Sequence, residues 1–254
     1  MSSTLLVDAG NTRLKWALCS AGGFSRQGEL AYDETHLSPR LAAQWDVLSR
    51  HPVSAVVLSN VAGQRVHEAV LQWVNGLQET TPMTIETVEA QKQAFGVNCA
   101  YARPERLGAD RWAGLVAARH HLPGASCIID CGTALTIDVL GANGDHLGGI
   151  IVPGRELMRR SLQRETAQVD VDTPVNHTLF AAKDTADAVQ AGIMAAIQGT
   201  VENVLRQYEQ KGLSPLTCVL TGGDAPAVLP VLPRGSLYEP HWVLKGLAVI
   251  AGCQ

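Results

Sequence analysis

The sequence predicts an α/β protein made of two similar halves with mixed sheets, and a turn that occurs twice carries that prediction. Leu5–Asp8 and Cys127–Asp130 are short apolar runs that each end in an aspartate, and a glycine turn with a threonine follows both. Apolar runs of this length, bounded by turn residues, are typical of buried strands. The Gly22-Gly23 and Asn143-Gly144 turns each join two further strand-like runs, so both halves should contain antiparallel strands.

The first half is expected to begin with antiparallel strands between Thr4 and Leu30 and to continue with a strand from Val53 to Leu58. Helices are predicted for Pro39–Arg50, which has proline in its first turn, and for Gln64–Leu77. The segment from Thr84 to Tyr101 shows no clear period and receives no assignment.

The second half shows a similar order of predicted strands and helices. Strands are expected at Ser126–Asp130, Thr136–Leu140, His146–Val152 and Leu216–Leu220. Helices are expected at Gly154–Gln168, Thr185–Lys211 and Trp242–Ala251. Ser59-Asn60-Val61 and Thr221-Gly222-Gly223 occupy corresponding places after a strand. An internal duplication is the simplest account. The Leu122-Pro123-Gly124 break then gives an N-terminal lobe of residues 1–122 and a C-terminal lobe of residues 123–254.

The composition is that of a compact globular protein, with 254 residues of which 46% are hydrophobic and 17% charged. A net charge of −4 leaves no basic stripe for nucleic acid, and the longest apolar stretches are too short to span a bilayer. The six cysteines include no C-x-x-C pair, which favours reduced, buried thiols over disulfides or zinc. Because no signal peptide opens the sequence, a cytoplasmic protein is expected.

The two aspartate turns indicate polyphosphate binding. A carboxylate at a strand end can hold hydrated Mg²⁺, glycine lets the backbone approach a ligand, and threonine offers a hydroxyl. Asp8, Thr12 and Lys15 are candidates in the first turn, although Lys15 is equally compatible with a solvated strand residue. In the second turn Thr133 is a phosphate-binding candidate and Asp130 a cation-binding one. Ligands in such folds bind at the carboxyl ends of strands, here in the cleft between the halves.

Further segments allow two interpretations each. Asp110 and Arg111 stand in the expected first turn of a helix, where Asp110 could accept a hydroxyl proton and Arg111 could bind an acidic substrate group. Composition alone favours an ordinary surface ion pair. The Thr221–Asp224 segment would let the backbone pass close to a nucleotide, or would start a helix with Asp224 as its N-cap. A basic helix face is interpreted as solvated; its members are Arg155, Arg159, Arg160 and Arg164.

These motifs resemble those of the actin, hexokinase and Hsp70 superfamily and, within it, of the type III pantothenate kinases. The resemblance is carried in order by D-A-G-N-T-R-L-K at 8–15, L-G-A-D-R-W at 107–112, D-C-G-T-A-L-T-I-D at 130–138, G-G-I-I-V-P-G at 148–154 and T-G-G-D at 221–224. It spans nearly the whole chain and implies a duplicated actin/hexokinase-like (ribonuclease H-like) two-lobe fold.

The resemblance also implies an activity: transfer of the γ-phosphoryl group of ATP to pantothenate, giving 4′-phosphopantothenate in the first step of coenzyme A biosynthesis. Asp110 would be the general base, and Asp130 would hold the monovalent cation, K⁺ or NH₄⁺, while Mg²⁺ accompanies ATP. The implied pantothenate site consists of Tyr101, Gly108, Ala109, Asp110, Arg111 and Thr185, with Thr185 supplied across a dimer. The implied ATP site consists of Asp8, Ala9, Gly10, Asn11, Thr12, Arg13, Leu14, Lys15 and Thr133.

Two alternatives remain open at the level of sequence. One keeps the fold and changes the reaction, to another small-molecule kinase or a phosphatase of the same superfamily. The other is a regulatory accessory protein on a kinase-derived scaffold, since some members of this family were first named as accessory factors for virulence-gene expression. The long apolar helix at Thr185–Lys211 indicates a homodimer interface, but an internal core would produce the same pattern.

Overall fold

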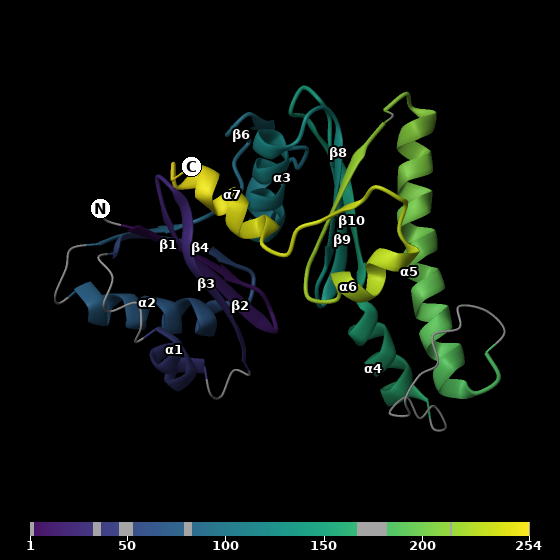
Figure 1. The fold of residues 1–254 in the computed structure, drawn as a ribbon, viewed down its shortest axis with the longest axis horizontal. Helices are drawn as coiled ribbons and strands as arrows, with labels where there is room; N and C mark the ends of the chain where they lie inside the picture. Colours follow the sequence, from purple (N-terminus) through teal and green to yellow (C-terminus); the bar gives the residue numbers. More distant parts are fainter. Residues whose placement is uncertain are drawn as a thin grey trace. The chain divides into compact units, whose positions relative to one another are not determined.

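The computed structural model describes residues 3–32, 37–45, 53–78, 83–166, 182–213 and 215–253. The chain divides into two compact units (Figure 1). The first contains Met1–His121 together with His241–Gln254, and the second contains Leu122–Pro240. The chain leaves the first unit after His121 and returns to it at His241 for its closing helix, whereas the lobes expected from the sequence, 1–122 and 123–254, are each one continuous segment.

The first unit is built on a mixed sheet. Its strands are β1 (Ser3–Ala9), β2 (Arg13–Ser20), β3 (Gly23–Ala31), β4 (Val53–Asn60) and β5 (Thr84–Thr87). They lie in the order β3-β2-β1-β4-β5. β1, β2 and β3 pair antiparallel, whereas β4 pairs parallel with β1 and with β5. The antiparallel start expected from the sequence is confirmed.

The second unit repeats this sheet strand for strand. Its strands are β8 (Ser126–Cys131), β9 (Ala134–Leu140), β10 (His146–Pro153), β11 (Thr217–Thr221) and β12 (Leu237–Tyr238), in the order β10-β9-β8-β11-β12. Parallel and antiparallel pairs fall at the same places as in the first sheet. Asp8 pairs in register with Ser59, and Asp130 pairs with Thr221, so the two aspartate turns are structural equivalents.

The helices α1 (Leu37–Trp45) and α2 (Gln64–Gln78) belong to the first unit, as do α3 (Ala109–His121) and α7 (Trp242–Ile250). The second unit contains α4 (Arg155–Glu165), α5 (Thr185–Gln210) and α6 (Ala225–Val228). The predicted helical residues 46–50 and 167–168 lie outside the described ranges. Within those ranges, no helix is both long and apolar enough to cross a membrane.

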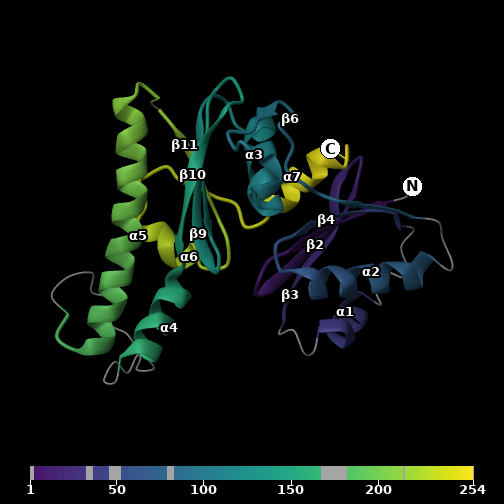
Figure 2. The ribbon, with the colours of Figure 1, turned by 180° about the vertical axis from the view of Figure 1, so that it is seen from behind.

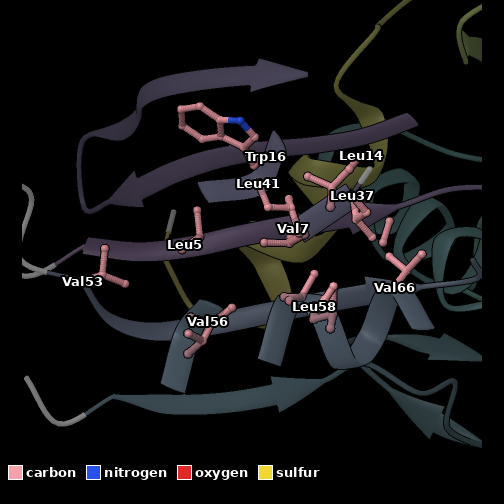
Figure 3. Packing of buried hydrophobic residues seen from close by; sticks show 14 of the residues in the cluster. Leu5, Val7, Leu14, Trp16, Leu37, Leu41, Val53, Val56, Leu58 and Val66 are labelled. Atoms are coloured by element: carbon pink, nitrogen blue, oxygen red, sulfur yellow. The ribbon is translucent and has the colours of Figure 1, made fainter. Parts of the chain in front are cut away.

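The core of the first unit lies between its sheet and the helices α1 and α2 (Figure 3). Alternate strand residues such as Leu5, Val7 and Leu58 are fully or almost fully buried there and meet Leu41 of α1 and Val66 of α2. The helix α7 contacts β1, β2 and β4, and α3 contacts β4. The indole Nε1 of Trp242 on α7 donates to the carbonyl oxygen of Gly114 on α3 at 3.0 Å. Burial of apolar faces holds these layers together.

The core of the second unit lies between its sheet and the helices α5 and α6 (Figure 2). Ile193, Ile197 and Val201 of α5 pack in one cluster with Ile129 and Ile137 of the sheet. The apolar face that the sequence shows on this helix is therefore explained by the core of the unit itself. This observation takes away the basis on which the helix pattern alone indicated a dimer interface.

Candidate active site

The first candidate phosphate turn joins β1 to β2 and is fixed by its own backbone. The N–H of Gly10 donates to the carbonyl oxygen of Arg13 at 3.0 Å, and the side chain of Arg13 forms an exposed ion pair with Glu29 at 3.1 Å. Asn11 and Thr12, at the tip of the turn, are exposed. The turn therefore presents a hydroxyl and backbone groups where a phosphate can reach them.

The residues predicted to bind ATP between Asp8 and Lys15 divide between the two faces of the sheet. Asp8 and Lys15 stand directly opposite each other in β1 and β2, and both are half-buried. Side chains in such a cross-strand pair are neighbours, so Lys15 lies beside the Asp8 carboxylate. Ala9 and Leu14 are fully buried in the core. These two residues can offer a ligand only their backbone atoms.

Ser59 is a residue of this site that the sequence did not identify as functional. It lies beside Asp8 in the parallel pair of β1 and β4, and its side chain is fully buried. Its hydroxyl donates to Oδ1 of Asp8 at 3.3 Å. A buried hydroxyl bonded to a carboxylate restrains the direction in which that carboxylate points. The only signal in the sequence was the position of Ser59 in the segment equivalent to Thr221-Gly222-Gly223.

The G-A-D-R segment begins α3 at the same end of the first unit. Ala109 is the first residue of the helix, and Asp110 lies in its first turn, as predicted. A Cβ added to Gly108 would lie 2.6 Å from Oδ1 of Asp110 and 3.6 Å from Val61, so only glycine leaves this carboxylate its present position. The N–H of Val61 in turn donates to the carbonyl oxygen of Ala9 at 3.0 Å. Through Val61, the start of α3 lies next to the carboxyl end of β1.

Tyr101 joins this group through Arg111. The guanidinium Nη1 of Arg111 donates to the Tyr101 hydroxyl at 3.0 Å, and the guanidinium carbon lies 5.8 Å from the centre of the ring. Arg111 is 8% exposed, while its backbone N–H donates to Oδ1 of Asp110 at 2.7 Å. A buried, oriented guanidinium is not an ordinary surface ion pair, so the structure disfavours that interpretation.

The second candidate phosphate turn lies in the second unit, between β8 and β9. The N–H of Gly132 donates to the carbonyl oxygen of Ala134 at 3.1 Å, which repeats the bond of the first turn with one residue fewer. Thr133 is exposed. A Cβ on Gly154 would lie 2.3 Å from the carbonyl oxygen of Gly132, so the start of α4 is packed against the backbone of this turn.

Asp130, the candidate cation ligand, is half-buried at the end of β8. A Cβ on Gly222 would lie 2.5 Å from Oδ1 of Asp130, so the glycine keeps the space beside the carboxylate open. Carboxylate and backbone carbonyl oxygens are the ligands that K⁺ takes. Asp130 therefore stays a candidate cation ligand on the chemistry of its carboxylate.

Two predictions about the arginines and the T-G-G-D segment need correction. Asp224 occupies the N-cap position of α6, as one interpretation of the sequence expected, but its side chain makes no capping hydrogen bond. The side chain pairs instead with Arg155, whose Nη2 lies 3.3 Å from Oδ1 of Asp224. Arg160 and Arg164 have 68% and 86% of their side chains exposed, so the predicted solvated face describes them. It is wrong for Arg155 and Arg159, which have 31% and 26% of their side chains exposed and pair with Asp224 and Glu156. Asp224 lies far from Arg155 in sequence, so no periodicity could reveal that pair.

Thr185 is the exposed first residue of α5, and the preceding Asp184 caps the helix by accepting from the N–H of Asp187 at 2.9 Å. It lines an apolar groove of about 940 Å³ between α4 and α5. The structure thus brings together Tyr101 and the G-A-D-R segment in the first unit, whereas Thr185 belongs to the second.

Known proteins resemble this chain in sequence or in fold. The profile of the family "Type III pantothenate kinase" matches residues 4–207. A type III pantothenate kinase of Nitrosococcus oceani is 37% identical over 252 residues, covering 97% of this chain and 93% of that protein. A type III pantothenate kinase of Aromatoleum aromaticum is 37% identical over 248 residues, covering 97% of each.

Solved structures with low sequence identity show the fold. A Campylobacter jejuni protein assigned to the Baf family of transcriptional activators has a TM-score of 0.60 at 18% identity, covering 98% of this chain and 97% of that one. A Sinorhizobium meliloti protein assigned as a 2-dehydro-3-deoxygalactonokinase has a TM-score of 0.61 at 13% identity, covering 98% of both chains. ADP-bound MreB5 of Spiroplasma citri has a TM-score of 0.52 at 9% identity, covering 99% and 97%.

The likenesses confirm the actin/hexokinase-like α/β fold with mixed sheets. At such low sequence identity, these structural likenesses say nothing about activity, and only the sequence relatives bear on that question. The family profile covers most of the chain, and the relatives match almost all of it. By these matches, the chain belongs to the type III pantothenate kinase family.

Proposed function

We propose that this protein is a pantothenate kinase that transfers the γ-phosphoryl group of ATP to the primary hydroxyl of pantothenate, giving 4′-phosphopantothenate, the first step of coenzyme A biosynthesis. One observation supports it best: in the first unit of a chain of this family, a phosphate turn and the G-A-D-R segment lie at the same end of the sheet. A phosphate donor and an acceptor hydroxyl must meet at such a place.

In the proposed mechanism, Asp110 orients the acceptor hydroxyl and takes its proton. The Arg111 N–H bond at 2.7 Å and the close approach of Gly108 hold the carboxylate in one position. Phosphoryl transfer has a loose transition state, so positioning and charge neutralisation supply most of the catalysis. The planar guanidinium of Arg111, oriented by Tyr101, suits the carboxylate of pantothenate.

For ATP, the proposal assigns Asp8, Thr12 and Lys15 of the first turn and Thr133 of the second. Hydrated Mg²⁺, arriving with ATP, would be held near Asp8 and would neutralise charge on the phosphate oxygens when bound. Lys15, opposite Asp8 in the sheet, would add a positive charge at the same place. Asp130 would hold K⁺ or NH₄⁺ beside the second turn.

We also propose that the protein is a homodimer in which Thr185 contributes to the pantothenate site of the partner subunit. Large apolar side chains of the second unit are exposed, with 60% of Ile151, 44% of Leu157 and 40% of Leu162 accessible. Both leucines line the groove beside Thr185, and a second copy of the chain would cover them. A cytoplasmic location stays a prediction of the sequence.

Subunit mixing tests the shared site. Asp110→Asn and Thr185→Arg homodimers should each be inactive, and a mixture refolded together should recover about a quarter of the parent turnover through heterodimers with one intact site. No recovery from a mixture shown by mass spectrometry to contain heterodimers would contradict a Thr185 contribution across the dimer.

The other functions considered have less support. The sequence relatives are named type III pantothenate kinases. Their names therefore support pantothenate as the acceptor over another small molecule, and an enzyme over a purely regulatory protein. A panel of small alcohols in place of pantothenate would detect another acceptor.

The decisive assay is ADP release from purified protein with Mg²⁺-ATP and pantothenate, with Na⁺, K⁺ or NH₄⁺ as the sole monovalent cation. Pantothenate-dependent turnover that needs K⁺ or NH₄⁺ is expected. Asp110→Asn should lower kcat about 10²- to 10⁴-fold with an unchanged melting temperature. Glu105→Gln, an exposed carboxylate nearby that pairs with Arg103, is the matched control and should behave as the parent. A folded parent protein without turnover in any of the three cations would overturn the proposed acceptor.

A further inference from the structure

Three segments of the second unit meet around its phosphate turn. The N–H of Gly154 donates to the carbonyl oxygen of Thr133 at 2.9 Å, and the N–H of Asp224 donates to the carbonyl oxygen of Cys131, also at 2.9 Å. Gly222 has no room for a Cβ against Cys131. Figures 1 and 2 accordingly show the start of α4 and the short helix α6 at the same end of this unit's sheet. The backbones of the three segments are fixed against one another.

Arg155 connects two of these segments by a side chain. It is the first residue of α4, and its Nη2 lies 3.3 Å from Oδ1 of Asp224, with 31% and 24% of the two side chains exposed. Within the described part of the chain its Nε is buried without a hydrogen-bond partner, so Asp224 does not use all of its donors. Arg159 and Arg160, by contrast, pair with Glu156 inside the helix.

The pair matters because two carboxylates stand close to a turn that is proposed to take phosphate. Burial is the main cause that raises the pKa of the Cys131 thiol, and the negative charges of Asp130 and Asp224 raise it further. Both carboxylates therefore lie near Cys131, beside the turn. A polyphosphate that approaches Thr133 therefore meets the negative charge of two carboxylates. A monovalent cation would offset Asp130, whereas Asp224 has the guanidinium of Arg155 beside it.

We propose that Arg155 is a positioning residue for ATP: its guanidinium neutralises Asp224, so that phosphate oxygens can approach the Gly132-Thr133 turn. The proposal rests on the proposed function, because it takes this turn as a phosphate site. It deepens that function by adding a residue that the family resemblance does not assign. Because this role is electrostatic, ATP binding should need the positive charge of Arg155 only as long as residue 224 carries a negative charge.

A double-mutant cycle tests this requirement. The variants are Arg155→Gln, Asp224→Asn and the double variant, with Arg160→Gln as a control on the same helix. ATP affinity is measured by calorimetry without pantothenate, and KM and kcat are measured with it. Arg155→Gln should weaken ATP binding and raise the KM for ATP about tenfold, with kcat and the KM for pantothenate within about twofold of the parent.

The double variant carries the decisive result. If Arg155 acts by neutralising Asp224, then Arg155→Gln combined with Asp224→Asn should bind ATP within about threefold of the parent. Asp224→Asn alone and Arg160→Gln should bind as the parent does. Parent-like binding by Arg155→Gln, or an unrescued double variant, overturns the proposal. Should Arg155→Gln fail to fold, Arg155→Lys keeps the charge and must bind as the parent does; weakened binding would equally overturn it.

The two proposals fail in different ways. A parent protein that binds ATP but does not phosphorylate pantothenate would refute the assigned acceptor, while the binding cycle at Arg155 would still give its answer. A parent that phosphorylates pantothenate, with ATP affinity insensitive to Arg155→Gln, would refute only the role of Arg155.

Discussion

The contact between α3 and α7 makes a quantitative prediction for Gly246→Ala. A Cβ on Gly246 would lie 1.9 Å from the carbonyl oxygen and 2.5 Å from the carbonyl carbon of Ala113. Normal contact at about 3.5 Å would require the two backbones to separate by roughly 1.5 Å. Because backbone cannot rotate away as a side chain can, we expect a cost at the upper end of overpacking, about 3 kcal/mol.

Alanine recovers part of this cost, since it is favoured over glycine in a helix by about 1 kcal/mol. The net loss of about 2 kcal/mol corresponds to a melting temperature lower by about 4–8 °C for a chain of this size. Gly76→Ala in α2 is the matched control, because the added Cβ would meet no heavy atom within 4 Å apart from its chain neighbours and the nearby backbone of its own helix. The control should melt at or slightly above the parent temperature.

Thermal unfolding followed by circular dichroism measures both variants, and pantothenate turnover below the transition reports on the site. Turnover should fall for Gly246→Ala, because α3 carries Asp110 in its first turn. A melting temperature of Gly246→Ala within about 1 °C of that of Gly76→Ala would show that the close approach of α3 and α7 leaves no room-dependent cost in stability.

Three further predictions follow from single contacts. Ser59→Ala removes the hydroxyl bonded to Asp8 and should raise the KM for Mg²⁺-ATP about tenfold, whereas Ser54→Ala, exposed on the same strand, should not; equal KM values for the two would exclude this role of Ser59. Cys253, whose pKa is raised to about 12 by burial and a neighbouring thiol, should react with iodoacetamide at pH 8 far more slowly than a free cysteine, as mass spectrometry would show; labelling at the free-cysteine rate would contradict this. The hydrogen bond from Arg159, one turn further along α4, is the main cause that lowers the pKa of Glu156 to about 2. Ionised Glu156 therefore stabilises the fold fully above about pH 4.3, and this stabilisation is lost as the pH falls towards 2. Carboxyl-carbon NMR should give a midpoint near pH 2, and a midpoint above pH 4 would contradict the pairing.

Most of the fold could be predicted from local sequence, because turn residues clearly bound most of the apolar runs that form the strands of each sheet. The apolar runs that end at Asp8 and Asp130 became β1 and β8, and the equivalence of Ser59 with Thr221 appeared in the register of both parallel pairs. The segment from Thr84 to Tyr101 could not be assigned because its strands are short: β5 (Thr84–Thr87) has four residues, and β6 (Gln93–Ala94) and β7 (Val97–Asn98) have two each. Strands this short show no period.

The candidate site was predictable where its residues are contiguous. The segment from Gly108 to Arg111 and the turn after Asp8 could be identified by motif, and the structure adds how they are held. Ser59 and the pair of Arg155 with Asp224 depend on strand pairing and on loop packing between distant segments. No spacing rule reports such contacts, since tertiary structure alone decides them.

The return of α7 to the first unit has a consequence for the order in which the chain folds during synthesis. Leu122–Pro240 leaves the ribosome as one continuous segment, so the second unit can complete its own core before the closing helix exists. The first unit cannot, since α3 waits for Trp242 and Gly246 to cover it. The half of the protein that is translated first is therefore the half that completes its packing last, and the side of α3 that α7 covers stays uncovered until then.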